Sequence, residues 1–219
     1  MERVPEKELM DDAEQARAYA ETDFSEPHEA FVSYFKERFP DFTSGEVFDI
    51  GCGTGDVIIR FAKALPDIHI TGIDGAGEML EIAQRDINKC GYTERIKLSN
   101  CLLPDPTLLK YKFDAVISNS ILHHLADPHV LWKTVRECAK KNAPIFIMDL
   151  FRPVSAEIAE ALVRQHAAEA SPILQKDFYN SLLAAYTPDE IKSQLRQNGL
   201  GALTVETVSD RHVIIWGTV

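Results

Sequence analysis

Glycines and acidic residues gather at one strand-to-helix junction of the sequence. Residues 49–56 read DIGCGTGD, between an apolar run expected to form a strand and a helix expected from Asp56. Glycines at such a turn permit positive φ and let a ligand approach the backbone closely. The spacing is GxGxG, and Asp56 takes the place of the third glycine of the dinucleotide fingerprint. Because Asp49 and Asp56 are poor surroundings for a pyrophosphate, the loop favours a ligand with a cationic head.

A further acid, Asp74, ends the next predicted strand. A carboxylate at this position can accept hydrogen bonds from both ribose hydroxyls of an adenosine. The alternative is that Asp74 caps the helix expected to start near Glu78. The glycine loop and the acid agree with each other, so we predict a ribose-binding role.

Strands and helices that alternate along the chain must position these residues. Strands are predicted at 47–50, 68–73, 96–98, 113–118, 143–150, 202–208 and 211–217, and helices from Asp56, over 78–89, after Asp127 and over 187–199. This alternation indicates a parallel sheet with helices on both faces. The first forty residues are also expected to be helical, with Leu9, Ala13, Ala16 and Ala20 at helical spacing and Ser25 as a possible cap. Residues 151–186 interrupt the alternation as a mainly helical insertion.

The composition limits the class of protein. The chain has 219 residues, of which 45% are hydrophobic and 26% charged, with a formal net charge of −11, as expected for one soluble globular domain. Lysine and arginine are not clustered, so we expect no nucleic-acid partner. No apolar run approaches the ~18 residues of a membrane span. The acidic N-terminus and the four cysteines without CxxC spacing predict a cytoplasmic protein.

Five segments together resemble the class I methyltransferases that use S-adenosylmethionine. DIGCGTGD and ITGIDGAGEML resemble the first two motifs of that family, and LSNCLLPDP, FDAVISNSILHHL and IFIMDL resemble the strand-end motifs that follow. The resemblance covers roughly residues 45–150, and the last helix and strand pair extend it to the C-terminus. It implies an α/β, Rossmann-like, doubly wound sheet of seven strands in the order 3-2-1-4-5-7-6, with the last strand antiparallel. The expected single domain comprises an N-terminal helical cap (1–43), a cofactor-binding core (44–150), a helical insertion or lid (151–186) and a C-terminal helix and strand pair (187–219).

The same resemblance implies roles for individual residues toward S-adenosylmethionine and its product S-adenosylhomocysteine. Gly51, Gly53 and Gly55 would face the methionine part, and Asp49 would reach its ammonium through water. Asp74 would hold the ribose. Met79 would pack on the adenine, with ordinary helix packing as an equal alternative. The remaining cofactor residues that the resemblance implies are Asn100 and Cys101 at the adenine edge and Asn119 near the methyl donor. Tyr19 is a further candidate from its position, as an aromatic of the N-terminal segment that could close over the cleft.

Methyl transfer from a sulfonium is an in-line displacement that mainly requires alignment of donor and acceptor. The acceptor is expected at the carboxyl ends of the fourth and fifth strands, where His123, Asp149 and Arg152 are the candidate catalytic residues. Arg152 is the candidate for holding an anionic group, with a salt bridge as the alternative. His123 and His124 are adjacent, so their side chains are expected to diverge, and no metal site is predicted.

These features predict an enzyme that transfers a methyl group to a small-molecule acceptor. Residues 119–122 read NSIL, unlike the Asn-Pro-Pro-aromatic motif of enzymes that methylate amides and adenine amines. Two other classes stay open: a non-catalytic cofactor-binding or interaction protein on the same fold, and a nicotinamide-dependent oxidoreductase, which the broken fingerprint disfavours. The acceptor, the methylated atom and the choice between monomer and homodimer are not determined at this level.

Overall fold

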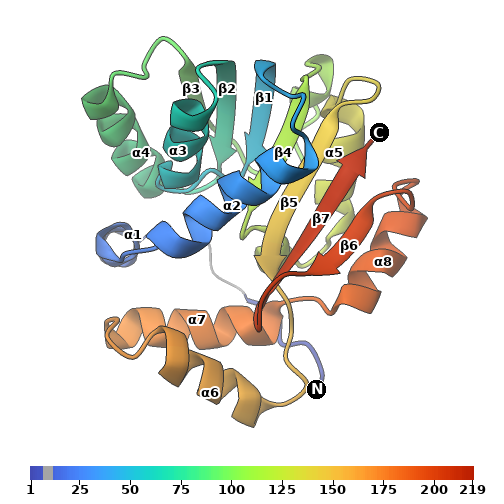
Figure 1. Cartoon of the computed structure of the whole chain (residues 1–219). Helices are drawn as coiled ribbons and strands as arrows, with labels where there is room; N and C mark the ends of the chain where they lie inside the picture. Colours follow the sequence, from blue (N-terminus) through green and yellow to red (C-terminus); the bar gives the residue numbers. More distant parts are fainter. Residues whose placement is uncertain (7–11) are drawn as a thin grey trace.

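A computed structural model describes residues 1–6 and 12–219 of the chain. Its centre is a seven-stranded sheet in the order β3-β2-β1-β4-β5-β7-β6 (Figure 1). β1 to β5 run parallel, and β7 is antiparallel to both of its neighbours, β5 and β6. The predicted order and the antiparallel last strand are confirmed. The strands are β1 (Ser44–Ile50), β2 (Asp67–Asp74), β3 (Ile96–Asn100), β4 (Ala115–Asn119), β5 (Pro144–Leu150), β6 (Thr204–Thr207) and β7 (His212–Thr218).

Helices cover both faces of the sheet. α2 (Ser25–Arg38), α3 (Asp56–Ala64) and α4 (Gly77–Cys90) pack on one face, and α5 (His129–Cys138) and α8 (Pro188–Gln197) pack on the other. α1 (Ala13–Glu21), α6 (Ala156–His166), α7 (Pro172–Ala184) and the N-terminal residues lie beyond the carboxyl ends of the parallel strands (Figure 1). Two short 3-10 turns, η1 (Leu108–Lys110) and η2 (Leu122–His124), complete the elements. None of the helices in the described part of the chain is long and apolar enough to cross a membrane.

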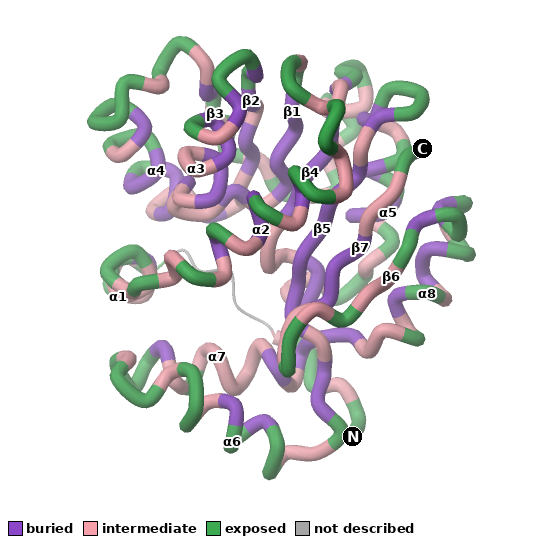
Figure 2. Tube along the Cα trace, in the orientation of Figure 1, coloured by how far each residue is buried: buried purple, intermediate pink, exposed green. Residues whose placement is uncertain are grey.

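The central strands are buried on both sides, as Figure 2 shows for β1, β4 and β5. Side chains of β5 alternate between the two layers, so that Phe146 packs with α2 and α3 while Ile145 packs with α5. Aromatic rings strengthen the first layer: the centroids of Phe35 and Phe61 lie 4.7 Å apart and those of Phe31 and Phe146 lie 4.9 Å apart, both edge to face. Each such pair contributes about 0.5–1.5 kcal/mol beyond area burial. This rigid sheet fixes the strand ends that carry the polar residues.

Local signals set most of the helix ends. Thr187 and Glu190 form a reciprocal capping box at the start of α8, and Gly91 ends α4 with a φ of 73°. The expected cap Ser25 is corrected, because α2 begins at this residue and Asp23 Oδ1 accepts the hydrogen bond from its backbone N–H. Residues 1–6 form no helix, although the N-terminal cap was expected to be helical. Leu9 lies outside the described residues.

Candidate active site

The glycine loop joins β1 to α3 with a backbone that only glycine adopts easily. Gly51 and Gly53 have φ values of 78° and 52°, in the left-handed region that other residues rarely enter. A Cβ atom at Gly51 would lie 2.7 Å from the side chain of Ile121, so this position also lacks space. A Cβ atom at Gly53 would meet no atom of the described structure within 4 Å. The loop therefore presents bare backbone at Gly53 to an open space.

Asp74 ties this loop to the end of β2. Its Oδ2 accepts a hydrogen bond from Gly53 N at 2.8 Å, and its Oδ1 accepts one from Ala76 N at 2.8 Å. Burial raises the pKa of Asp74, and the two backbone N–H groups oppose that shift. Ala76 is itself the N-cap of α4 and α4 has no side-chain cap, so the alternative capping role for Asp74 does not hold.

Two buried oxygens lie at the carboxyl ends of β1 and β4 without a partner. Asp49 Oδ1 and Asn119 Oδ1 accept no hydrogen bond from the described residues. Asp49 is only 2% exposed, and burial, with a contribution from Asp74, raises its pKa to about 8. A buried polar atom normally has a partner, because an unsatisfied one costs about 1–3 kcal/mol. The two oxygens therefore indicate a bound group that donates hydrogen bonds.

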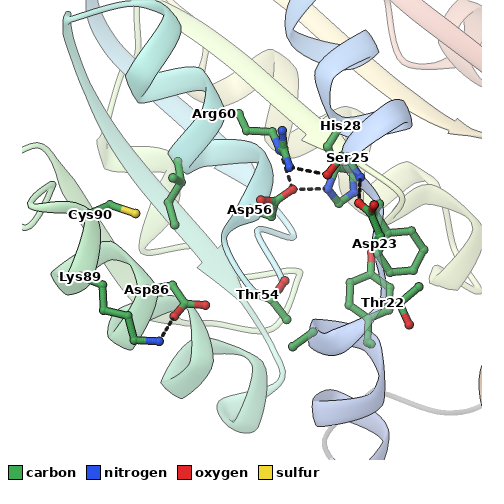
Figure 3. A pocket seen from close by; sticks show the side chains of 14 residues that line it. Thr22, Asp23, Ser25, His28, Thr54, Asp56, Arg60, Asp86, Lys89 and Cys90 are labelled. Carbon is green, nitrogen blue, oxygen red and sulfur yellow. Dashed lines mark hydrogen bonds and ion pairs between the residues drawn. The ribbon is translucent and has the colours of Figure 1, made fainter.

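Asp56, the other acid that flanks the loop, is already paired. Its Oδ2 lies 2.6 Å from His28 Nδ1 and 2.8 Å from Arg60 Nε (Figure 3). Although burial opposes the shift, these two partners lower the pKa of Asp56. This corrects the expectation that Asp56 offers its charge to a cationic ligand. The cavity beside it, about 310 Å³, is lined by residues of α1 to α4 and of the glycine loop.

The residues expected around an adenine lie next to the end of β2. Asp74 pairs with Asn100 in the parallel register of β2 and β3, and Asn100 Nδ2 donates to Gly75 O. Cys101 is half-buried, with its Sγ 3.3 Å from Asp105 Oδ2. Met79 is buried in a small cluster with Ala76, Ile82 and, from α1, Ala16 and Tyr19. Helix packing therefore accounts for Met79 in this structure, and its contact with an adenine stays a prediction.

Tyr19 lies at the same end of the site. Its ring packs on that of Phe24 at a centroid distance of 4.6 Å. Burial raises the pKa of Tyr19 to about 12, with contributions from the carboxylates of Asp56 and Asp74. The helical cap thus brings a neutral phenol to the edge of the predicted cofactor site.

His123 and Asp149 form a buried pair at the ends of β4 and β5. His123 Nδ1 lies 2.5 Å from Asp149 Oδ1, and the side chains are 4% and 1% exposed. Asp149 also accepts hydrogen bonds from Leu122 N and Leu150 N, each at 2.7 Å. Burial alone would lower the pKa of His123, but the charge and hydrogen bond of Asp149 raise it. The predicted proximity of these two residues is present, and the pair fixes the imidazole orientation.

Arg152 is engaged in structural contacts. Its Nη2 donates to Glu190 Oε1 at 2.7 Å, its Nη1 to Ala185 O and its Nε to Met1 O. The side chain is 7% exposed. This corrects the prediction that Arg152 faces the cleft to hold an anionic group, because its donors bind the C-terminal end of α7, the start of α8 and the N-terminus. The alternative salt bridge is what the structure contains.

The N-terminal residues contribute side chains that the sequence analysis missed. Glu6 Oε2 lies 2.8 Å from His124 Nδ1, and Arg3 Nη2 donates to His123 O and Leu125 O. The rings of His123 and His124 lie side by side, with centroids 4.1 Å apart and an interplanar angle of 38°. The expected divergence of the two histidines is therefore wrong. η2 is a tight turn at the end of β4, where the alternation of a strand no longer applies.

Comparison with known proteins gives concordant results. A family model described as a methyltransferase domain matches residues 48–145. An uncharacterized protein of Synechococcus is 35% identical over 138 residues, which are 63% of this chain and 32% of that protein. An O-methyltransferase of Aspergillus nomiae, rstn1, is 23% identical over 174 residues, 80% of this chain and 72% of that protein. The plantazolicin methyltransferase BpumL, solved with S-adenosylhomocysteine and a substrate analog, superimposes with a TM-score of 0.69 at 16% identity, over 94% of this chain and 91% of that chain.

The matched domain contains the glycine loop, Asp74 and the β4 end, and the last of these comparisons reproduces the fold. Residues 48–145 therefore resemble a methyltransferase domain, and the fold of the chain is that of solved S-adenosylmethionine-dependent methyltransferases. It spans about a third of the length of the Synechococcus relative.

Proposed function

We propose that this protein transfers a methyl group from S-adenosylmethionine to a small-molecule acceptor. One observation carries the proposal: the glycine loop, with open space at Gly53, lies beside two buried oxygens, Asp49 Oδ1 and Asn119 Oδ1, that accept no hydrogen bond from the described residues. The α-ammonium of the cofactor is a cationic donor of the required kind, and Asp74 has further lone pairs for ribose hydroxyls. The O-methyltransferase rstn1 and the small-molecule substrate analog bound to BpumL favour the same class of reaction.

When bound, S-adenosylmethionine supplies an electrophilic methyl group on a sulfonium. The protein then has to bind the cofactor and align it with the acceptor. Gly51, Gly53 and Gly55 let the backbone approach the methionine part, and Asp49 and Asp74 bind its two ends. His123, oriented by Asp149, contacts the acceptor at the carboxyl ends of β4 and β5. Placement of two reactants at contact distance supplies several kcal/mol of the barrier reduction.

We further propose that the protein has no nucleic-acid partner, because the net charge is −11 and cations are not clustered in the sequence. A cytoplasmic location is proposed from the four cysteines without CxxC spacing. Met79, Asn100, Cys101 and Tyr19 are proposed to surround the adenosine. Arg152 is left out of the acceptor site because its donors are occupied.

A screen of metabolite pools with methyl-labelled S-adenosylmethionine tests the proposal. At least one small molecule is expected to gain label with the wild-type protein, and less label is expected with Asp74→Ala at a cofactor concentration close to the wild-type Kd. If the protein binds the cofactor but labels no compound, the second class, a non-catalytic cofactor-binding protein, replaces the enzyme. If NAD binds and S-adenosylhomocysteine does not, the oxidoreductase class replaces both.

A further inference from the structure

Glu6, His123 and His124 converge beside the predicted acceptor position. One ligand atom of each residue lies within 4.8 Å of the corresponding atoms of the other two. Two imidazoles and a carboxylate are a ligand set that zinc accepts, and sites with three protein ligands keep one coordination position open. We propose that these three side chains bind one divalent transition-metal ion of the zinc type.

The ligands are held by independent parts of the chain. η2 carries both histidines, and the backbone of this turn is fixed because Arg3 donates to His123 O and Leu125 O. Glu6 arrives with the N-terminal residues, which Val4 N anchors to Leu183 O at 3.0 Å. The convergence therefore does not depend on one flexible side chain, and it joins residues more than a hundred positions apart.

Neighbouring groups fix the orientation of two of the three ligands, His123 and Glu6. Asp149 holds His123 Nδ1, which leaves Nε2 as the nitrogen available to an ion. Such a carboxylate–histidine contact is the usual support of a metal-bound imidazole. Ser181 Oγ donates to Glu6 Oε1 at 3.1 Å, which leaves Oε2 for the ion.

Glu6 Oε2 supplies a separate indication of a ligand. It is buried, and none of the described residues donates a hydrogen bond to it with acceptable geometry, although His124 Nδ1 lies 2.8 Å away. This contact is an ion pair when His124 is protonated, and with a neutral His124 a metal ion would take its place at the oxygen.

The spacing suits one ion after the side chains close around it. Zinc lies about 2.0–2.2 Å from nitrogen and oxygen ligands, so two ligands in its tetrahedral geometry are about 3.4 Å apart. The observed limit of 4.8 Å therefore requires side-chain shifts of up to about 1.4 Å. With neutral histidines, the three ligands carry a single negative charge toward a doubly charged cation.

The position of the site suggests a use that rests on the proposed function. η2 follows β4, next to Asn119, and contacts β5, at the strand ends where the acceptor is expected. An ion with an open coordination position there would bind an oxygen, nitrogen or sulfur atom of the acceptor, and His123 would act on the acceptor through the ion.

Metal titration of the full chain tests the site without reference to activity. The chelator-treated protein is titrated with Zn²⁺ by calorimetry and with Co²⁺ by visible absorption, and bound zinc is counted by elemental analysis. One equivalent is expected. Glu6→Gln is expected to lower the affinity at least about tenfold and Asp149→Asn about 10- to 100-fold, as for other residues that support metal ligands.

His69→Ala is the matched control, because His69 is another histidine near a carboxylate, 3.9 Å from Glu46, but more than half exposed. It should bind zinc as the wild type does. Absence of a stoichiometric ion, or equal affinity in wild type and folded Glu6→Gln, would overturn the proposal and leave a hydrogen-bonded cluster. Binding of S-adenosylhomocysteine is measured on the same variants, so that failure of the metal site and failure of the proposed function are distinguished.

Discussion

Asp49 is buried, and one of its carboxylate oxygens has no hydrogen-bond partner in the described structure. The protonation state of Asp49 therefore depends on the group that binds beside it. Its pKa of about 8 in the empty protein is far above the ordinary value of about 3.9. The folded state therefore retains a proton that the unfolded state loses. The contribution of Asp49 to the free energy of unfolding is fully present below about pH 4 and is lost as the pH rises toward 8.

Binding of a cationic ammonium favours the ionised form of Asp49. We predict that S-adenosylhomocysteine binding near pH 6.5 releases a proton and that the affinity increases between pH 6 and 7.5. Calorimetry in buffers of different ionisation enthalpy measures that release. Asp49→Asn is the matched control, since it retains the shape but not the titration, and its affinity should change less with pH. Equal pH dependence in both proteins would remove Asp49 from the ammonium site.

For Arg152 we predict an effect on stability and none on ligand affinity, because its contacts are structural. Arg152→Met removes its hydrogen bonds to Met1 O, Ala185 O and Glu190. The free energy of unfolding is expected to fall by about 1–3 kcal/mol, while the affinity for S-adenosylhomocysteine is unchanged. Urea unfolding gives the first quantity and calorimetry the second.

Arg164→Met is its control, since Arg164 is 70% exposed and, among the described residues, makes only a long contact with Glu160. Such a surface pair contributes about 0–1 kcal/mol. A variant of Arg152 with normal stability and impaired methyl transfer would restore this residue to the acceptor site.

At the scale of elements, α6 and α7 pack on the end of the sheet rather than on its faces. Their apolar residues form a small cluster with Leu150, the last residue of β5, which also contains Ala159, Leu162, Leu182 and Ala185. α1 reaches α7 through Gln15 Nε2, which donates to Asp177 Oδ2 at 2.9 Å. Elements with few buried contacts of their own open at lower free energy than a central sheet.

We therefore predict that residues 12–25 and 151–186 exchange amide hydrogens faster than β1, β4 and β5 in the empty protein. Bound S-adenosylhomocysteine should slow this exchange, because closure over a ligand orders the elements that cover it. Hydrogen exchange followed by mass spectrometry, with and without the ligand, measures the difference. α8 serves as the internal reference, since it packs on the opposite face of the sheet from α3, the helix that follows the glycine loop. Protection equal to that of the central strands in both states would make these helices permanent cover.

The elements themselves were largely predictable from local chemistry. The capping box at Thr187, the left-handed Gly91 after α4 and the apolar run 143–150 each depend on neighbours in sequence. The helices predicted over 78–89 and 187–199 and the strand predicted over 143–150 are present. The sheet order came from the family resemblance, since periodicity alone does not specify which strands pair. The extended residues 1–6 were missed because their partners, Val154, Leu183 and His123, follow at least 120 positions later.

The site residues can also be separated into those that depend on local sequence and those that depend on long-range packing. The loop glycines, Asp49, Asp74 and the His123–Asp149 pair follow from strand ends that meet at one edge of the sheet. Glu6 and the engagement of Arg152 depend on long-range packing of the N-terminus against α7 and α8. No spacing in the sequence encodes those contacts. The side-by-side histidines depend on a 3-10 turn that the strand pattern did not predict.

For the whole molecule, the central claim is that one S-adenosylmethionine-type ligand binds between the glycine loop and Asp74. Calorimetric titration of the full chain with S-adenosylhomocysteine tests it most directly, with NAD and Asp74→Ala as controls. We predict one site for S-adenosylhomocysteine and no binding of NAD. Asp74→Ala should lose about 1.5–3 kcal/mol, the cost of hydrogen bonds to a charged group, which is roughly a 10- to 150-fold loss of affinity. Binding of NAD without S-adenosylhomocysteine, or equal affinity in folded Asp74→Ala, would contradict the claim.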